Sequence, residues 1–289
     1  MLVDRPDEIG AVHRDYLAAG SDCISTASYQ ATVSGFMGYG HDRTESLELL
    51  RRATRVAVAA VDASCGTRSP SGETEPRPLV AASVGSYGAY LGDGSEYDGR
   101  YEISDDELRA FHAERFRVLA GSGADLLACE TIPSAREATV LLQLLSEMEE
   151  AWAWFTFSCP DGRTIWDGTS IEDVASRCAA SPRVAGVGIN CTDPQFVGEL
   201  TERIGTSTEL PIIVYPNSGE RYDPVGKSWA ETEDGSGVTW LGGVEAAWRA
   251  GARVIGGCCR TGPKEIAELR ARLAGGDFSA GYGDQGELR

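Results

Sequence analysis

Short, continuously apolar segments alternate with longer amphipathic segments along almost the whole chain. Seven apolar segments predict buried strands, at residues 23–26, 79–84, 125–129, 152–158, 184–190, 211–215 and 253–257. Eight amphipathic segments predict helices, at residues 7–19, 44–63, 104–121, 134–149, 171–180, 194–204, 240–250 and 262–273. Strands that are apolar along their whole length are buried on both faces, which is typical of parallel strands covered by helices.

Two α/β folds contain such an alternation. A (β/α)8 barrel of the TIM type needs about 250 residues, and the predicted elements fall one strand short of it. A doubly wound sheet is the alternative, but no Gly-x-Gly-x-x-Gly turn follows the first predicted strand. We therefore predict a TIM-type barrel domain over residues 1–274 that lacks one strand, followed by a flexible tail at 275–289, where Gly, Asp, Ser and Gln dominate.

Charge and hydropathy exclude several classes of partner. The formal net charge of −18 argues against nucleic acid and against an anionic membrane surface. The N-terminal residues do not resemble a signal peptide, and no run of about 18 apolar residues occurs, so we expect a cytoplasmic protein. In a reducing compartment the eight cysteines are expected to be free, metal-bound or catalytic rather than disulfide-bonded.

Three of these cysteines stand at the ends of predicted strands. Cys258 and Cys259 follow Gly256-Gly257, and Cys191 follows Gly188-Ile189-Asn190. A single free cysteine is usually a small packing residue, and we assign that role to the other five, Cys23, Cys65, Cys129, Cys159 and Cys178. In a barrel, however, the C-terminal ends of the strands meet at one mouth. Three thiolates there predict a zinc site with an open fourth position for a substrate thiol.

Other polar residues are expected at the same mouth. Glu130 follows the third predicted strand and would bind a substrate ammonium group, unless it pairs with an arginine. The glycine- and tyrosine-rich loop at 85–97 would cover a cationic methyl donor with its rings and the Glu96 carboxylate, or else form a solvated lid. The three histidines lie away from the strand ends and are not predicted to bind metal. The remaining strand-end residues are Thr26, Ser83, Ser158 and Tyr215.

The split cysteine pattern resembles that of a known family. Gly188-Ile189-Asn190-Cys191 with Gly256-Gly257-Cys258-Cys259-Arg260 is similar to the zinc-binding pattern of the homocysteine S-methyltransferases, in particular the bacterial S-methylmethionine:homocysteine methyltransferases. The resemblance extends from Ile9 to Leu273. Further matches lie at residues 26–32, 85–97, 125–131 and 215–220.

The resemblance implies a (β/α)8 barrel with Zn²⁺ on Cys191, Cys258 and Cys259. It implies methyl transfer from a sulfonium donor, S-methylmethionine or less well S-adenosylmethionine, to homocysteine, as a step of methionine biosynthesis. No catalytic residue is expected beyond the zinc-activated substrate thiol. Glu130 is implied to hold the homocysteine amino group, and we expect Asn190 and Thr26 to line the same pocket.

The resemblance also carries one departure and several alternatives. Members of the family begin with a strand that bears an Asp-Gly-Ala-Met-type turn, closes the barrel and binds homocysteine, whereas this sequence starts at the following helix. A catalytically impaired zinc- or thiol-binding barrel is therefore one alternative. Betaine as the methyl donor is another, and the homocysteine module of a cobalamin-dependent methionine synthase is a weaker third. The sequence leaves donor preference and oligomeric state open.

Overall fold

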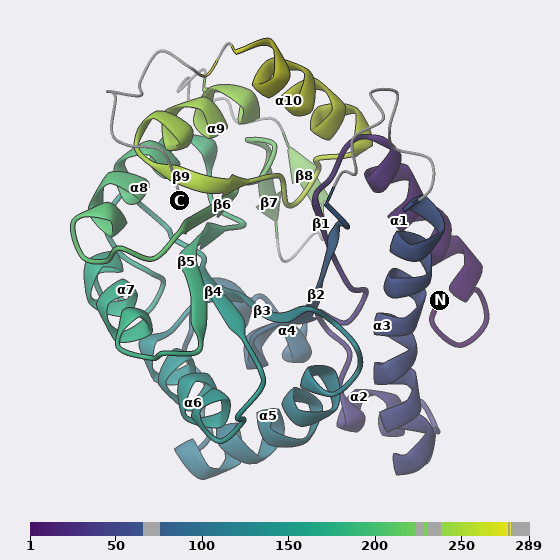
Figure 1. Ribbon diagram of the computed structural model, residues 1–289. Coiled ribbons are helices and arrows are strands. Elements are labelled where there is room, and N and C mark those ends of the chain that lie inside the picture. Colours follow the sequence, from purple (N-terminus) through teal and green to yellow (C-terminus); the bar gives the residue numbers. More distant parts are fainter. Residues whose placement is uncertain (66–75, 224–227, 231–237, 277, 279–289) are drawn as a thin grey trace.

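A computed structural model describes residues 1–65, 76–223, 228–230, 238–276 and 278 of the chain. Seven parallel strands form one curled sheet, and helices surround it on the outside (Figure 1). The sheet order is β1-β2-β3-β4-β5-β6-β9, so β1 and β9 are its edge strands. The strands are β1 (Cys23–Ser25), β2 (Leu79–Val84), β3 (Leu126–Ile132), β4 (Ala153–Phe157), β5 (Val184–Asn190), β6 (Ile212–Tyr215) and β9 (Ala252–Ile255).

Each long helix predicted from the sequence is present. The helices are α1 (Pro6–Ala18), α3 (Arg43–Ser64), α5 (Asp105–Ala120), α6 (Ala135–Ser146), α7 (Ile171–Ala179), α8 (Val197–Gly205), α9 (Trp240–Arg249) and α10 (Pro263–Gly275). Local signals define their starts: Asp42 and Ser104 each form a capping box with the glutamate three residues later, before α3 and α5. The α/β barrel architecture predicted from the alternating segments is therefore confirmed, with seven strands in the described sheet.

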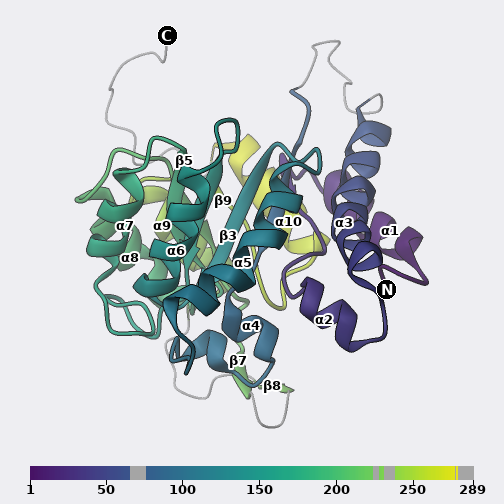
Figure 2. The same ribbon diagram turned by 90° about the horizontal axis from the view of Figure 1, so that it is seen from below.

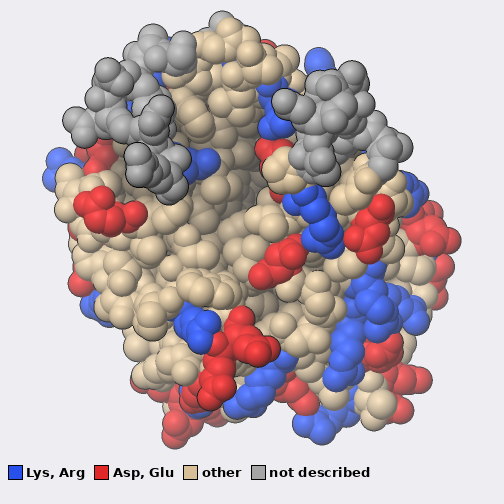
Figure 3. All heavy atoms as spheres, in the orientation of Figure 1, with Lys and Arg blue, Asp and Glu red and all other residues tan. Residues whose placement is uncertain are grey.

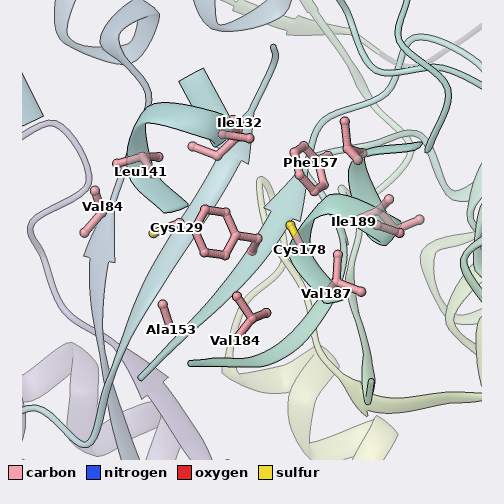
Figure 4. Packing of buried hydrophobic residues seen from close by; sticks show 14 of the residues in the cluster. Val84, Cys129, Ile132, Leu141, Ala153, Phe157, Cys178, Val184, Val187 and Ile189 are labelled. Atoms are coloured by element: carbon pink, nitrogen blue, oxygen red, sulfur yellow. The ribbon is translucent and has the colours of Figure 1, made fainter. Parts of the chain in front are cut away.

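Residues along each strand alternate between two apolar layers. In β3, Leu127 and Cys129 point outward into the layer between the sheet and the helices, where Figure 4 shows Cys129 near Leu141 of α6. Ala128 points inward and packs with Trp154 of β4. This period of two follows from strand geometry. It sends Glu130, the next inward residue of β3, toward the inside of the sheet at its C-terminal end.

Two glycines in β5 allow the inner layer to pack closely. A Cβ atom at Gly188 would clash with the backbone oxygen of Ile213 in β6, and one at Gly186 would meet the Ile213 side chain. The glycine in Gly188-Ile189-Asn190-Cys191 is thus required by the strand pairing of β5 with β6. It brings the end of β5, and Cys191 after it, close to the end of β6.

The outer layer continues across the two edge strands. The hydroxyl of Tyr16 in α1 donates to the backbone oxygen of Thr261, just before α10, at 2.9 Å. Asp22, before β1, pairs with Arg270 of α10 at 2.7 Å. Helices α1 and α10 therefore hold the two edges of the sheet near one another, although β1 and β9 do not pair in the described part of the chain.

Three short elements were not expected from the sequence. Helix α2 (Val33–Gly38) lies between the strand predicted at residues 23–26 and the helix predicted at 44–63, and α4 (Tyr87–Leu91) with the 3-10 turn η1 (Ser95–Tyr97) lies in the predicted 85–97 loop. These elements are too short to show a helical period, and side-chain caps define them instead: Thr32 accepts from Gly35 N, and Ser86 from Ala89 N. The third element is an antiparallel hairpin, β7 (Arg221–Asp223) with β8 (Ser228–Ala230).

The boundaries also differ in detail. Strand β3 runs through Glu130 to Ile132 rather than ending at residue 129, and a short 3-10 turn η2 (Pro194–Phe196) precedes α8. Residues 66–75 and most of the predicted tail at 275–289 lie outside the described residues. Phe278 is described, and it packs against Trp248 of α9.

Elements that follow the C-terminal ends of the strands gather at one end of the molecule. Figure 2 shows both α4, which follows β2, and the β7–β8 hairpin, which follows β6, at that end. In the view of Figure 3 both signs of charge are spread over the outer surface, while the region over the sheet is mostly uncharged. None of the described helices is long and apolar enough to cross a membrane.

Candidate metal centre and substrate pocket

The three predicted cysteines lie together at the C-terminal end of the sheet. Cys191 directly follows β5, and Cys258 and Cys259 lie in the turn between β9 and α10. Their three Sγ atoms lie within 4.8 Å of one another, and the Cys191 and Cys259 sulfurs are 3.6 Å apart. The edge of a tetrahedron of sulfurs around zinc is about 3.8 Å, from a Zn–S distance of about 2.3 Å. The donor set and its spacing therefore fit a soft divalent metal.

The turn that carries Cys258 and Cys259 is fixed by its backbone. Gly256 N donates to Val214 O at 2.9 Å, and Cys258 N donates to Pro216 O at 2.8 Å, so the turn continues along the end of β6. A Cβ atom at Gly257 would clash with the Thr261 side chain. Gly257 therefore allows the close approach of this turn to Thr261, whereas a Cβ atom at Gly256 would meet Tyr215 only at ordinary contact distance.

The thiols of the cluster influence one another's ionisation. Hydrogen bonds from Cys191 and Cys258 lower the pKa of Cys259 to about 4, although burial opposes this shift. The pKa of Cys258 is raised, first by its hydrogen bond to Cys191 and then by its hydrogen bond to Cys259. Cys259 is therefore the thiol that ionises first, and its neighbours act as donors toward it. Coupled thiols of which one ionises readily are expected in a metal-binding cluster.

Cys191 of the cluster and the nearby Thr131 both have left-handed backbone. Asn190 precedes Cys191 and hydrogen-bonds Thr131. Cys191 has φ 49° and Thr131, at the end of β3, has φ 57°. Asn190 Oδ1 accepts from Thr131 N, and Asn190 Nδ2 donates to Thr131 Oγ1, both at 2.7 Å. Asn190 is 1% exposed. This reciprocal pair of hydrogen bonds joins the ends of β3 and β5, and it holds the Thr131 backbone beside Asn190 and Cys191.

Glu130 accepts hydrogen bonds from two hydroxyl groups on neighbouring strands. Ser83 Oγ of β2 donates to its Oε1, and the Tyr215 hydroxyl of β6 donates to its Oε2 at 3.0 Å. Thr156 of β4 in turn contacts the Tyr215 hydroxyl at 2.7 Å. Burial raises the pKa of Glu130, and the two hydroxyl hydrogen bonds lower it by less. Within the described part of the chain no arginine pairs with Glu130, so the carboxylate keeps lone pairs for a ligand.

The segment 85–101, which contains α4 and η1, lies against the cysteine cluster. The Tyr97 hydroxyl is 3.3 Å from Cys191 Sγ, and Trp166, in the loop after β4, packs edge-on against the Tyr97 ring with centroids 6.0 Å apart. Glu96 Oε2 is shielded from solvent and has no hydrogen-bond partner among the described residues. Burial raises the pKa of Glu96, and the nearby Cys191 raises it further.

A buried network of charged groups holds both ends of this segment. The Glu137 carboxylate of α6 accepts from Tyr87 N at 2.6 Å and from the Tyr101 hydroxyl at 3.0 Å. His112 Nε2 lies 2.7 Å from Glu137, and Arg115 donates to His112 Nδ1 at 3.3 Å and to the backbone oxygen of residue 85. Burial lowers the pKa of His112. A neutral ring with its proton on Nε2 satisfies both contacts.

The other predicted residues take different places. Thr26 is buried, and its hydroxyl accepts from Ser83 N and contacts Ser28 Oγ, so it links β1 to β2; its role in substrate binding stays a prediction. Ser158 Oγ donates to Glu96 O at 3.5 Å. Among the five cysteines assigned to packing, Cys65 is exposed, because it follows the last turn of α3. His13 of α1 is buried, and the buried His112 contacts Glu137 and Arg115.

Some residues around the site were missed by the sequence reasoning. Tyr29 and Trp166 were not singled out, and neither was the pairing of Asn190 with Thr131. Tyr29 hydrogen-bonds Thr131, and its pKa is raised by burial and by the nearby Cys191. Tyr29 lies three residues after Thr26 at the end of a predicted strand, and this position could have indicated that it lies near the site. Trp166 lies in a loop far from any strand end in sequence, and no local pattern places it beside Tyr97.

Comparison with known proteins gives consistent matches over nearly the whole chain. A family model described as "Homocysteine S-methyltransferase" matches residues 1–273. Homocysteine S-methyltransferase YbgG of Bacillus subtilis is 46% identical over 94% of this chain and 85% of its own length. Selenocysteine Se-methyltransferase of Brassica oleracea var. italica is 44% identical over 94% of this chain and 81% of its own.

A solved structure shows the same fold. The metallated form of the homocysteine methyltransferase MmuM from Escherichia coli superimposes with a TM-score of 0.80 and 40% sequence identity. The match covers 94% of this chain and 86% of that one.

Proposed function

The chain belongs to the homocysteine S-methyltransferase family, and we propose that it transfers a methyl group from S-methylmethionine, or less well S-adenosylmethionine, to the sulfur of homocysteine. The observation that carries this proposal is the convergence of three cysteine sulfurs within 4.8 Å of one another at the mouth of the barrel, beside a buried carboxylate. A thiol-binding centre and an ammonium-binding group are what recognition of homocysteine requires. The proposal places the reaction in the cytoplasm and in methionine biosynthesis.

We assign Cys191, Cys258 and Cys259 as the ligands of Zn²⁺. Three sulfur ligands leave one tetrahedral position open, as in catalytic rather than structural zinc sites. Zinc held there would act as a Lewis acid that binds the substrate thiol and lowers its pKa, so that a thiolate is available near neutral pH. The spacing of the three sulfurs supports this assignment.

The side chains around the cluster orient the acceptor. Glu130 would hold the homocysteine ammonium group. The hydroxyl groups of Ser83 and Tyr215 keep the Glu130 carboxylate in place through their hydrogen bonds. Asn190 fixes the backbone before Cys191 and thus the position of the thiol site. The role of Thr26 would be indirect, through its contact with Ser83 N.

The chemical step is a displacement at a methyl carbon. The homocysteine thiol loses its proton to solvent, and the thiolate electron pair forms the new S–CH₃ bond. The donor S–CH₃ bond breaks, and its electron pair stays on the donor sulfur, which becomes a neutral thioether. With S-methylmethionine both products are methionine. The sulfonium is already activated, so no further cofactor is required.

The test combines metal analysis with methionine formation from homocysteine and S-methylmethionine. We expect about one zinc per chain in the wild type and loss of both zinc and activity in a Cys258→Ser/Cys259→Ser double variant. Cys65→Ser is the matched control, because Cys65 is exposed and belongs to no described cluster. Wild-type activity in the double variant would refute the metal mechanism. Zinc binding without methyl transfer from any donor would support the impaired thiol-binding barrel, and turnover with betaine alone would identify the other alternative.

A further inference from the structure

Glu96 presents a buried acceptor that the proposed reaction has not yet used. Its Oε2 atom is shielded from solvent and has no donor among the described residues. A carboxylate oxygen without a hydrogen bond is costly to bury, because it loses its hydration without compensation. Backbone hydrogen bonds from Glu96 and Gly94 favour the charged form of the carboxylate, whereas the nearby acidic groups Cys191 and Asp93 oppose it. Among the described residues no ion pair of Glu96 with an arginine or lysine is present.

The position of Glu96 relates it to the cysteine cluster. It lies in η1 directly before Tyr97, whose hydroxyl is 3.3 Å from Cys191 Sγ. Cys259 is influenced electrostatically by both Glu96 and Glu130. The cluster therefore has two carboxylates within electrostatic reach, one from strand β3 and one from the 85–101 segment.

The two carboxylates differ in the hydrogen bonds that they accept. Glu130 accepts hydrogen bonds at both oxygens, from Ser83 and Tyr215, whereas Glu96 Oε2 accepts none that the structure describes. Trp166 adds a complementary group. It packs against Tyr97, and its Nε1 is buried and also lacks a hydrogen-bond partner among the described residues. An unpaired acceptor thus lies in the residue before Tyr97, and an unpaired donor lies in a residue whose ring packs against Tyr97.

We infer that Glu96 binds the α-ammonium group of the methyl donor and that Trp166 Nε1–H donates to its α-carboxylate. The inference rests on the proposed function, in which acceptor and donor are both amino acids. Two amino-acid substrates bring two ammonium groups, and the site offers two carboxylates. The Tyr97 and Trp166 rings then lie beside the sulfonium, which a ring face attracts. The enzyme is thereby specific for sulfonium amino acids over donors without a primary ammonium group.

The test compares two donors in a Glu96→Gln variant. S-methylmethionine carries the α-ammonium group, and dimethylsulfoniopropionate is a sulfonium that lacks it. We expect the KM for S-methylmethionine to rise about 10- to 100-fold, the effect of losing a hydrogen bond between charged groups. The KM for homocysteine and the KM for dimethylsulfoniopropionate should stay within about 2-fold. Trp166→Phe should raise the KM for S-methylmethionine by about 10-fold and leave the KM for homocysteine within about 2-fold.

Two controls separate this role from a structural one. Asp98→Asn makes the same charge change in the same segment, at an exposed side chain that pairs with Arg100, and should leave all three KM values unchanged. Glu130→Gln should show the opposite pattern to Glu96→Gln, with a raised KM for homocysteine. Thermal melting and metal content of each variant establish that the fold is intact.

Other outcomes would overturn the inference. An unchanged KM for S-methylmethionine in Glu96→Gln, a raised KM for homocysteine, or equal effects on both sulfonium donors would each contradict it. If the wild type forms methionine from neither donor, the proposed function fails, and calorimetric titration of S-methylmethionine into the metal-loaded protein decides the inference by itself. Binding to the wild type that weakens about 10-fold or more in Glu96→Gln would sustain it, and equal or absent binding would refute it.

Discussion

Replacement of Asn190 by alanine tests whether this side chain holds the two strained strand ends at the site. In the native protein it forms two hydrogen bonds of 2.7 Å with Thr131, one to the backbone N–H and one to the hydroxyl. Thr131 is 3% exposed, so solvent does not replace the lost acceptor. Its left-handed backbone, with φ 57°, stores strain that the surroundings must offset.

The magnitude follows from these contacts. A buried N–H left without an acceptor costs about 1–3 kcal/mol, and loss of the second, neutral hydrogen bond costs about 1 kcal/mol. We expect Asn190→Ala to lower the free energy of unfolding by about 2–4 kcal/mol. Thr131→Val keeps the branched shape and the backbone hydrogen bond but removes the hydroxyl, so it should cost only about 1 kcal/mol.

The assay is urea denaturation of the metal-free, reduced protein, followed by tryptophan fluorescence and by circular dichroism. Competition with a chromophoric chelator then measures zinc affinity, which we expect to fall about 10-fold or more in Asn190→Ala, as for other groups that orient metal ligands. The reasoning would be refuted by an Asn190→Ala variant within about 0.5 kcal/mol of the wild type. A Thr131→Val variant as unstable as Asn190→Ala would also contradict it.

Three further predictions concern buried groups away from the cysteines. Tyr101→Phe removes a donor to buried Glu137 and should lower the free energy of unfolding by about 1.5 kcal/mol in urea denaturation, while Tyr39→Phe, at an 89% exposed residue, should not change it. Glu137→Gln should cost about 3–5 kcal/mol, because it leaves the buried Arg115 without its counter-charge; equal losses for Tyr101→Phe and Glu137→Gln would contradict this. Burial lowers the pKa of His13 below 6.5, so the unfolded chain takes up a proton that the folded chain does not. Stability should therefore be complete above about pH 6.5 and fall as the pH drops below it, and His13→Leu should reduce that slope by up to about 1.4 kcal/mol per pH unit; an unchanged slope would refute it.

The sequence was sufficient to predict the parts of the molecule that depend on burial. Central strands of the sheet are largely apolar on both faces, so β2 at Leu79–Val84 and β5 at Val184–Asn190 were found within a residue or two. The cysteine cluster could be predicted because parallel strands bring their C-terminal ends together, whatever the distance in sequence between Cys191 and Cys258. The topology alone places these residues at one mouth.

Contacts between side chains on different elements were not predictable in the same way. The 85–97 stretch was interpreted as a loop, because helices of one turn contain too few residues to show a period. The network of Glu137, His112 and Arg115 involves two helices and the start of α4, and its members look like ordinary surface residues of amphipathic helices. Their burial becomes apparent only when the 85–101 segment lies across them.

This network relates stability to the geometry of the site. Glu137 holds Tyr87 N near the start of the 85–101 segment and the Tyr101 hydroxyl at its end. Between these anchors lies Tyr97, whose hydroxyl contacts the cysteine cluster. The cysteines themselves are fixed by the ends of β5 and β6, which are rigid parts of the sheet. A change at Glu137 should therefore displace the 85–101 segment relative to the metal ligands, and it should weaken donor binding more than metal binding.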